Sequence, residues 1–284
     1  MTTNQRQKSR PAKKVTPRTV QKRSVLIYGS SGRMGQELIK LLKDHPTLKL
    51  AATVDASEIT AIDSGHTALL KTTPTALAAV LQGADGVIDF SSESGTQKLC
   101  QALAAANNLI VLIGTTGLPQ KTTDAMELVA KKRGHKILLA GNTSLGVATL
   151  ARLSVAAGQI LAPAGFDIEI TETHHRMKAD SPSGTALLLA SMLKDSLKGT
   201  SVVFHREGKR KPNTIGIHSI RGGGVVGEHD VRFVSDFEEI KLTHRAFSRS
   251  LFADGALNLV ISMEQDLKPG TAKTLKEFLS LKTL

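Results

Sequence analysis

The sequence predicts a two-domain α/β protein, in which a doubly wound parallel sheet is followed by a smaller α+β domain with a mixed or antiparallel sheet. A length of 284 residues suits two domains of ordinary size. The first half alternates short apolar runs with helical patterns, whereas the second half contains strands that alternate with period two. Aromatic residues make up only 3%, so the cores depend on aliphatic side chains, which suits helices packed on sheets.

The first ordered segment has the pattern of a strand, a glycine-rich turn and a helix. Val25–Tyr28 is a continuous apolar run, short enough for a buried parallel strand. The loop GSSGRMG (Gly29–Gly35) follows it, and apolar residues then recur at helical spacing up to Leu42. Such a turn lets the backbone approach a pyrophosphate, and the N–H groups at the helix start bind the anion. The loop therefore predicts a Rossmann-like dinucleotide site, with Ser31 in place of the usual middle glycine.

An acidic residue ends the next predicted strand. Leu48–Val54 runs into Asp55, twenty residues beyond Gly35, where a carboxylate would accept hydrogen bonds from the adenosine ribose. Ala56 follows instead of an arginine, so a 2′-phosphate would be repelled and NADH is favoured over NADPH. Arg33 could still reach such a phosphate. The alternative is that Asp55 only caps a turn.

The alternation of strands and helices continues to residue 139. The predicted strands are Gly86–Phe90, Leu109–Ile113 and Lys136–Leu139, and the predicted helices are Thr96–Ala106 and 120–132. Polar loops follow these strands at Ser91–Ser92, Gly114–Gly117 and Gly141–Ser144. Because ligands sit outside the carboxyl ends of parallel strands, these loops either hold a nicotinamide ribose and carboxamide or are ordinary turns. Their shared placement favours binding.

The pattern changes after a predicted helix at Leu145–Ile160. Phe166–Thr171, Ile215–Ile220 and Ile240–Thr243 alternate with period two, as half-exposed strands do. A second domain therefore begins near residue 146.

The densest reactive chemistry follows the first of these strands. His174, His175, Arg176 and Lys178 lie within five residues, and Ser183-Gly184-Thr185 then opens a helix at Leu187–Leu197. The helix start and the cations suit a dicarboxylate, and a histidine exchanges protons near neutral pH. A metal site is disfavoured, since adjacent residues of an extended chain point to opposite faces. Ser183 is predicted to be the helix N-cap and not a nucleophile. A charged surface loop remains the structural alternative.

Most of the net charge of +12 belongs to the N-terminus. Residues 1–23 contain eight Lys or Arg and no acid, which leaves +4 for residues 24–284. This basic tail is predicted to be disordered. A transit peptide and a polyanion-binding arm are alternatives, and nucleic acid is an unlikely partner for the rest. The single Cys100 excludes an internal disulfide, and no apolar stretch has membrane-spanning length, so the chain is expected to be soluble and cytoplasmic.

Five motifs together resemble the 4-hydroxy-tetrahydrodipicolinate (dihydrodipicolinate) reductase family: GSSGRMG, GTTG, HHRMKADSPSGTA (His174–Ala186), RGGGVVGEH (Arg221–His229) and SRSLFADGA (Ser248–Ala256). The resemblance implies reduction of a cyclic dicarboxylate by NADH or NADPH with loss of water, in lysine and diaminopimelate biosynthesis. It also implies a homotetramer. The expected division is a dinucleotide-binding domain at 24–145, completed by 247–284, and a substrate-binding and oligomerisation domain at 146–246. Another two-domain imine or amino-acid dehydrogenase, and a nucleotide-sensing regulator, are the rival interpretations.

The resemblance also assigns roles to residues. His174 and Lys178 would exchange protons, and His175, Gly184 and Thr185 would hold the substrate's carboxylates. The implied cofactor residues are Gly29, Ser30, Ser31, Gly32, Arg33, Met34, Asp55, Gly114, Thr115, Thr116, Ala140, Gly141, Asn142 and Thr143, with no metal. Thr143 departs from the family, where an aromatic residue is common at this place.

Overall fold

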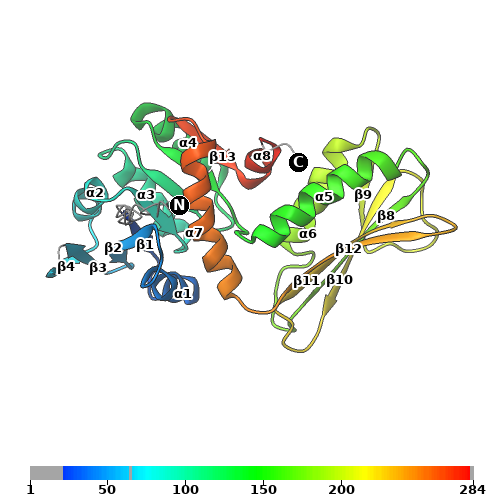
Figure 1. Cartoon of the computed structure of the whole chain (residues 1–284), viewed down its shortest axis with the longest axis horizontal. Coiled ribbons are helices and arrows are strands. Elements are labelled where there is room, and N and C mark those ends of the chain that lie inside the picture. Colours follow the sequence, from blue (N-terminus) through cyan, green and yellow to red (C-terminus); the bar gives the residue numbers. More distant parts are fainter. Residues whose placement is uncertain (1–21, 64–65, 282–284) are drawn as a thin grey trace, which may run out of the picture.

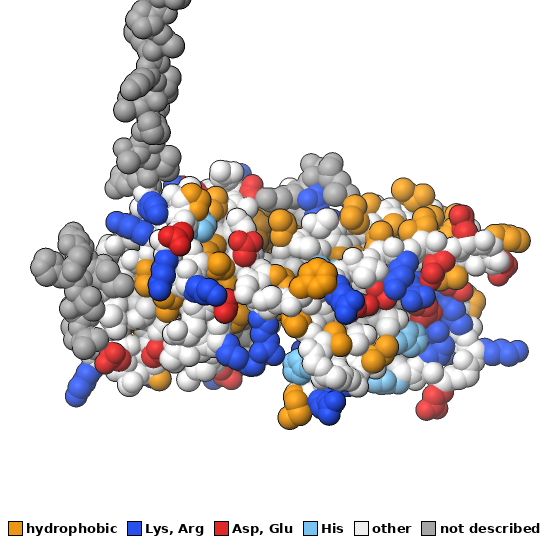
Figure 2. All heavy atoms as spheres, turned by 60° about the horizontal axis from the view of Figure 1, so that its bottom comes forward, with side chains coloured by type: hydrophobic (Ala, Val, Ile, Leu, Met, Phe, Trp, Pro, Cys, Tyr) orange, Lys and Arg blue, Asp and Glu red, His pale blue; other side chains and the backbone are white. Residues whose placement is uncertain are grey.

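The computed structural model describes residues 22–63 and 66–281 and shows two lobes joined near the middle of the molecule (Figure 1). A notch separates the lobes in the space-filling view (Figure 2). The predicted disordered tail lies almost wholly at residues 1–21, outside the described part of the chain.

The first lobe is built on an eight-stranded sheet in the order β13-β7-β6-β5-β1-β2-β3-β4. Its strands from β13 to β2 are parallel. Their bounds are β1 Arg23–Tyr28, β2 Leu48–Val54, β5 Gly86–Asp89, β6 Ile110–Ile113, β7 Lys136–Leu139 and β13 Thr271–Thr274. The parallel sheet that the alternating pattern predicts is thereby confirmed.

Helices cover both faces of this sheet, as a doubly wound fold requires. On one face, α1 (Arg33–Leu42) and α7 (Ser250–Asp266) pack through aliphatic residues such as Leu38 and Val260. On the other face, α2 (Pro74–Gln82), α3 (Glu93–Leu103) and α4 (Gln120–Arg133) bury residues such as Leu77, Leu99 and Met126. The lobe thus has three layers with an aliphatic core on each side of the sheet.

Two strands extend the sheet beyond β2. β3 (Glu58–Asp63) pairs antiparallel with β2, and β4 (His66–Lys71) pairs antiparallel with β3. The sequence does not predict this hairpin, because no continuous apolar run marks these strands. β4 is the edge strand of the sheet, and β3 lies between it and β2.

The second lobe contains a five-stranded mixed sheet in the order β12-β11-β8-β10-β9. Its strands are β8 Asp167–His174, β9 Ser201–Phe204, β10 Thr214–Arg221, β11 Gly227–Val234 and β12 Glu239–Ala246. β8, β9 and β10 are parallel, whereas β11 and β12 are antiparallel to their neighbours. The helices α5 (Leu145–Leu161) and α6 (Gly184–Ser196) pack on one face of it. The predicted mixed sheet is confirmed, although β9 and β11 are not among the predicted strands.

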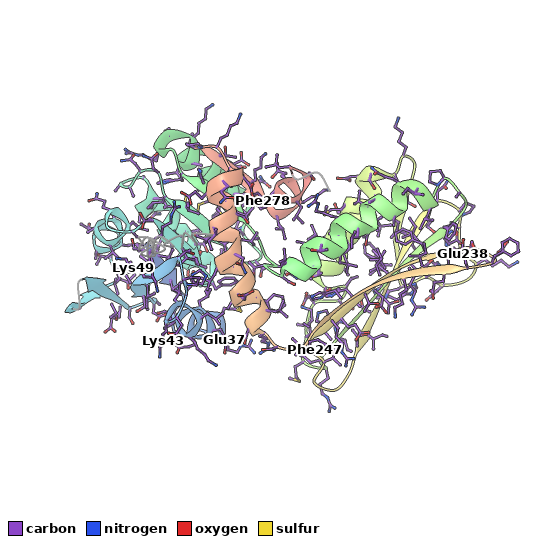
Figure 3. The ribbon with its side chains drawn as sticks, viewed as in Figure 1. Glu37, Lys43, Lys49, Glu238, Phe247 and Phe278 are labelled. Atoms are coloured by element: carbon purple, nitrogen blue, oxygen red, sulfur yellow. The ribbon has the colours of Figure 1, made fainter. Side chains whose placement is uncertain are left out.

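The chain returns to the first lobe after β12. Phe247 lies in the segment that joins β12 to α7, between the lobes (Figure 3). At the start of α7, the Ser250 hydroxyl donates to the carboxylate of Glu37 on α1 at 2.8 Å. β13 then pairs with β7, and α8 (Leu275–Ser280) follows. Lys276 of α8 contacts Ser191 (2.8 Å) and Asp195 of α6, which ties the lobes together.

Candidate active site

A cleft of about 800 Å³ lies between the two lobes. From the first lobe it is lined by predicted cofactor residues, namely Met34, Gly114, Thr116, Gly141, Asn142 and Thr143. From the second lobe it is lined by every predicted catalytic and substrate residue: His174, His175, Lys178, Gly184 and Thr185. Two sets of residues that lie far apart in the sequence therefore face one space.

The remaining predicted cofactor residues lie elsewhere. Gly29, Ser31, Gly32 and Asp55 line a second pocket of about 240 Å³, next to Ala56 and Lys98. Ser30 is buried beside Asp55 and Arg33 is exposed at the start of α1. Thr115 and Ala140 are not among the lining residues of either space.

The glycine-rich loop is tight enough to hold a pyrophosphate. Gly29 has φ +81°, and a Cβ there would lie 2.4 Å from the carbonyl oxygen of Phe90. A Cβ on Gly35 would lie 2.3 Å from the carbonyl oxygen of Gly29, so the close packing of α1 on the loop requires glycine there. Gly32, the N-cap of α1, makes no side-chain cap, and the first N–H groups of the helix are left for an anion. The loop therefore fits a dinucleotide.

The carboxylate of Asp55 faces this loop. It accepts hydrogen bonds from the hydroxyls of Ser30 (2.6 Å) and Ser31 (2.9 Å) and from the backbone N–H of Ser31. Ser31, which departs from the usual glycine, thus bonds to the acid at the end of β2. This arrangement puts the acid within the second pocket, beside the first turn of the loop.

The loop after β7 connects the two lobes at the cleft. The Asn142 side chain donates from Nδ2 to the Thr185 hydroxyl at 2.7 Å and accepts at Oδ1 from the Ser144 N–H at 2.9 Å. The Thr143 hydroxyl donates to the carbonyl oxygen of Phe252 in α7 at 2.5 Å. The Thr143 side chain is therefore held against α7 by a hydrogen bond. A loop predicted to bind nicotinamide is joined directly to the start of α6.

His174 lies at the end of β8 and is almost fully buried. Its Nδ1 lies 2.5 Å from Oε2 of Glu172, which sits two residues earlier on the same face of the strand. Burial lowers the pKa of His174 below its usual range, and the neighbouring Glu172 carboxylate only partly opposes this shift. Burial therefore favours the neutral imidazole before an anionic substrate enters.

Lys178 projects into the cleft and pairs with Asp180 at 2.8 Å. The Asp180 side chain is about half exposed. Loss of hydration is the largest single effect on its pKa and raises it, but the hydrogen bond and charge of Lys178, together with the backbone N–H groups of Asp180 and Gly184, outweigh this effect and lower the pKa. An incoming carboxylate can compete with such an exposed partner for the ammonium group. His175 lines the same space.

The start of α6 lines the cleft next to Asp180, whose carboxylate interacts with the backbone N–H of Gly184. The Ser183 hydroxyl accepts from the Ala186 N–H at 3.2 Å, which confirms the predicted N-cap. Gly184 is exposed, and a Cβ there would meet no atom within 4 Å. A substrate carboxylate that displaces the half-exposed Asp180 side chain would therefore have room at this helix terminus.

Several cleft or near-cleft residues are missing from the predicted site. Glu172 and Arg221 form a buried ion pair, with Arg221 donating to both carboxylate oxygens at 2.7 and 2.8 Å. Arg249 and Lys276 line the cleft from the returning C-terminal segment. Arg221 and Arg249 both lie in motifs on which the family resemblance rests, so the sequence could have indicated them as site residues. Lys276 lies in none of these motifs.

Two features are absent from residues 22–63 and 66–281. No three His, Cys, Asp or Glu side chains there come together in a way that could hold a metal ion. Within the same residues, the helices are all too short or too polar to cross a membrane.

Comparisons with known proteins agree with the motifs. Residues 23–143 match the family described as dihydrodipicolinate reductase, N-terminus, and residues 146–279 match dihydrodipicolinate reductase, C-terminus. The 4-hydroxy-tetrahydrodipicolinate reductase of Agrobacterium fabrum is 39% identical over 259 residues, which are 87% of this chain and 92% of that protein. The one of Cupriavidus necator is 37% identical over 272 residues, 91% of this chain and 100% of that protein.

Solved structures share the fold. Dipicolinate-bound dihydrodipicolinate reductase from Paenisporosarcina sp. TG-14 matches with a TM-score of 0.70 and 21% identity over 90% of this chain and 99% of that chain. The diaminopimelate dehydrogenase of C. glutamicum matches less well, with a TM-score of 0.53 and 13% identity over 93% of this chain and 97% of that one. The predicted relationship is confirmed, and the rival dehydrogenases are similar in fold alone. The chain belongs to the dihydrodipicolinate reductase family of nicotinamide-dependent oxidoreductases.

Proposed function

We propose that this chain reduces 4-hydroxy-tetrahydrodipicolinate to tetrahydrodipicolinate with loss of water, in lysine and diaminopimelate biosynthesis. The observation that carries this proposal is the cleft between the lobes, in which loops predicted to bind nicotinamide face His174, Lys178 and the start of α6. We also propose that the enzyme works as a cytoplasmic homotetramer. Exposed apolar side chains on the second lobe, such as Phe237 and Ile240, support an interface there.

The residues of the cleft have distinct tasks in this proposal. When bound, the nicotinamide supplies a hydride to the conjugated substrate ring. The start of α6, through Gly184 and Thr185, holds one substrate carboxylate, and His175 holds the other. His174 gives a proton from Nε2, since its Nδ1 is directed at Glu172, and Lys178 serves as a second proton donor. The dicarboxylate itself favours the protonated form of His174 once bound.

A steady-state assay tests the proposed reaction. The purified chain is mixed with NADH and with substrate made in place by the preceding synthase, and the loss of NADH absorbance is followed. We expect rapid NADH oxidation that requires the synthase. Reduction of NAD by aspartate or another amino acid, without synthase-dependent NADH oxidation, would favour an amino-acid dehydrogenase instead.

We propose that NADH is preferred over NADPH, because Asp55 and Ala56 line the adenosine-side pocket. Lys98 lines the same pocket and provides some attraction for a 2′-phosphate. Ala56→Arg should therefore raise kcat/KM for NADPH by roughly tenfold, since a charge-assisted hydrogen bond contributes about 1.5–3 kcal/mol. Ala56→Gln adds a long side chain without a charge, so it should give no comparable gain in kcat/KM for NADPH. A wild-type enzyme that uses NADPH more efficiently than NADH would contradict the preference.

A further inference from the structure

The carboxylate of Glu172 is fully buried behind the cleft and is surrounded by hydrogen-bond donors. It receives two bonds from the Arg221 guanidinium, one from the imidazole of His174, and one from the backbone N–H of Ser183 at 3.1 Å. A carboxylate has about four acceptor sites, and here all of them are used. One side chain is therefore bonded both to the proposed proton donor and to the N-cap residue of α6.

Arg221 keeps this carboxylate ionised. Burial alone would raise the pKa of Glu172, but the side chains of Arg221, Ser219 and His174 outweigh it and lower this pKa to about 2. Arg221 also donates to the carbonyl oxygen of Asp180 at 2.6 Å, so it holds the loop between His174 and α6. The ion pair thus fixes both ends of the reactive segment.

The orientation of His174 follows from this contact. With Nδ1 directed at Glu172, only Nε2 is left for a ligand. Gly227 on β11 lies beside that nitrogen, and a Cβ there would lie 3.0 Å from Nε2. The absence of a side chain at 227 leaves Nε2 accessible.

Other charged and titratable groups face His174 from each neighbouring element. Arg221 on β10 and Lys178 in the loop oppose its protonation, and His229 on β11 lies with its ring centre 5.1 Å away. His229 contributes no charge near neutral pH, because burial lowers its pKa to about 3. Among these groups, Glu172 is thus the one whose negative charge favours the imidazolium form of His174.

We propose that Glu172 is a positioning residue for the reduction: it directs Nε2 of His174 at the substrate, favours its protonated form, and fixes the start of α6 against the substrate's carboxylate. This role rests on the proposed function, since it acts through His174 and Ser183. Glu172 and Arg221 would then act on the reacting atoms only through His174 and Ser183.

The experiment compares the pH dependence of kcat in Glu172→Gln and Glu169→Gln with that of the wild-type enzyme. If His174 donates a proton, kcat falls as pH rises through the pKa of His174 in the complex. Loss of the neighbouring negative charge lowers that pKa, so in Glu172→Gln the fall should begin about 1–3 pH units lower. The KM for substrate should rise as well, because the start of α6 loses an anchor, whereas the KM for NADH should stay unchanged.

Glu169 is a matched control. It lies on the same strand and is also held by arginines and a histidine, namely Arg206 (2.5 Å), Arg210 (3.2 Å) and His218 (2.8 Å), but on the face of the sheet away from Glu172. Its replacement should lower thermal stability without shifting the pH profile. If Glu172→Gln does not fold, Glu172→Gln/Arg221→Gln avoids an unpaired buried guanidinium and should show the same direction of shift.

The possible outcomes separate this role from the proposed function. An inactive wild-type enzyme would refute the proposed function itself. An active wild-type enzyme whose pH profile is unchanged by Glu172→Gln, or shifted equally by Glu169→Gln, would overturn the positioning role of Glu172.

Discussion

The His174→Gln variant is expected to lose about 10²–10⁴ in kcat, the range for removal of a general acid. This corresponds to roughly 3–5 kcal/mol of transition-state stabilisation. Glutamine retains an amide that can bond to Glu172, but it has no proton to give at neutral pH. Because His174 lies on the second lobe, away from the glycine-rich loop, the dissociation constant of NADH should change by less than about twofold.

Single-turnover kinetics and NADH titration by fluorescence measure the two quantities separately. Lys178→Met offers a comparison, since it removes a positive charge from the same cleft but keeps an unbranched apolar side chain there. It should raise the KM for substrate as well as lower kcat. Equal losses of turnover and NADH affinity in His174→Gln would show that His174 is not the proton donor.

The Gly29→Ala variant should lose both stability and cofactor affinity. At φ +81° an alanine costs about 1–2 kcal/mol. Its Cβ would also lie 2.4 Å from the carbonyl oxygen of Phe90, and forcing such a contact apart costs about 1–3 kcal/mol more. The free energy of unfolding should therefore fall by about 2–5 kcal/mol. Because the loop must move to relieve the clash, NADH should bind more than about tenfold more weakly.

Gly165→Ala is the control for Gly29→Ala. Gly165 has φ +90°, but a Cβ there would meet no atom within 4 Å, and it lies between α5 and β8 in the second lobe. Denaturant unfolding should show only the cost of the backbone conformation, and NADH affinity should be unchanged. Equal effects of both substitutions on NADH binding would contradict a role for the loop's close packing.

The sequence predicts the first lobe well where periodicity is strong. Val25–Tyr28 and Leu109–Ile113 are short apolar runs, as strands buried on both faces have, and β1 and β6 are found there. The hairpin β3-β4 and the strand β9 are not predicted, because β4 and β9 are edge strands, which need no such run, and β3 mixes polar with apolar residues. Ser201–Phe204, for example, is half exposed along its length.

The strand pairings of the second lobe lie beyond what periodicity can predict. Arg221 and Glu172 are 49 residues apart and meet because β10 pairs with β8 in the register that puts Arg221 opposite His174. Alternation shows that each strand has two faces, but it does not show which strand lies beside which. The buried ion pair was therefore invisible until the register was known.

The candidate site, like the fold, is predicted where its residues lie close together in the sequence. The loop from His174 to Thr185 concentrates its chemistry in a short segment, so the sequence identifies it directly. The contact between Asn142 and Thr185 depends on how the two lobes are oriented, and so does the position of Lys276 at the cleft. Such contacts join residues that lie far apart in the sequence and have no short-range pattern.

Isotope transfer tests the central claim, that one cleft passes a hydride directly to a cyclic dicarboxylate. NADH deuterated at the reactive position of C4 is supplied with synthase-generated substrate, and the tetrahydrodipicolinate formed is analysed by mass spectrometry. The account predicts a single deuterium atom in each product molecule and its near absence with His174→Gln over the same time. Consumption of the labelled NADH with no deuterium in the product would contradict it.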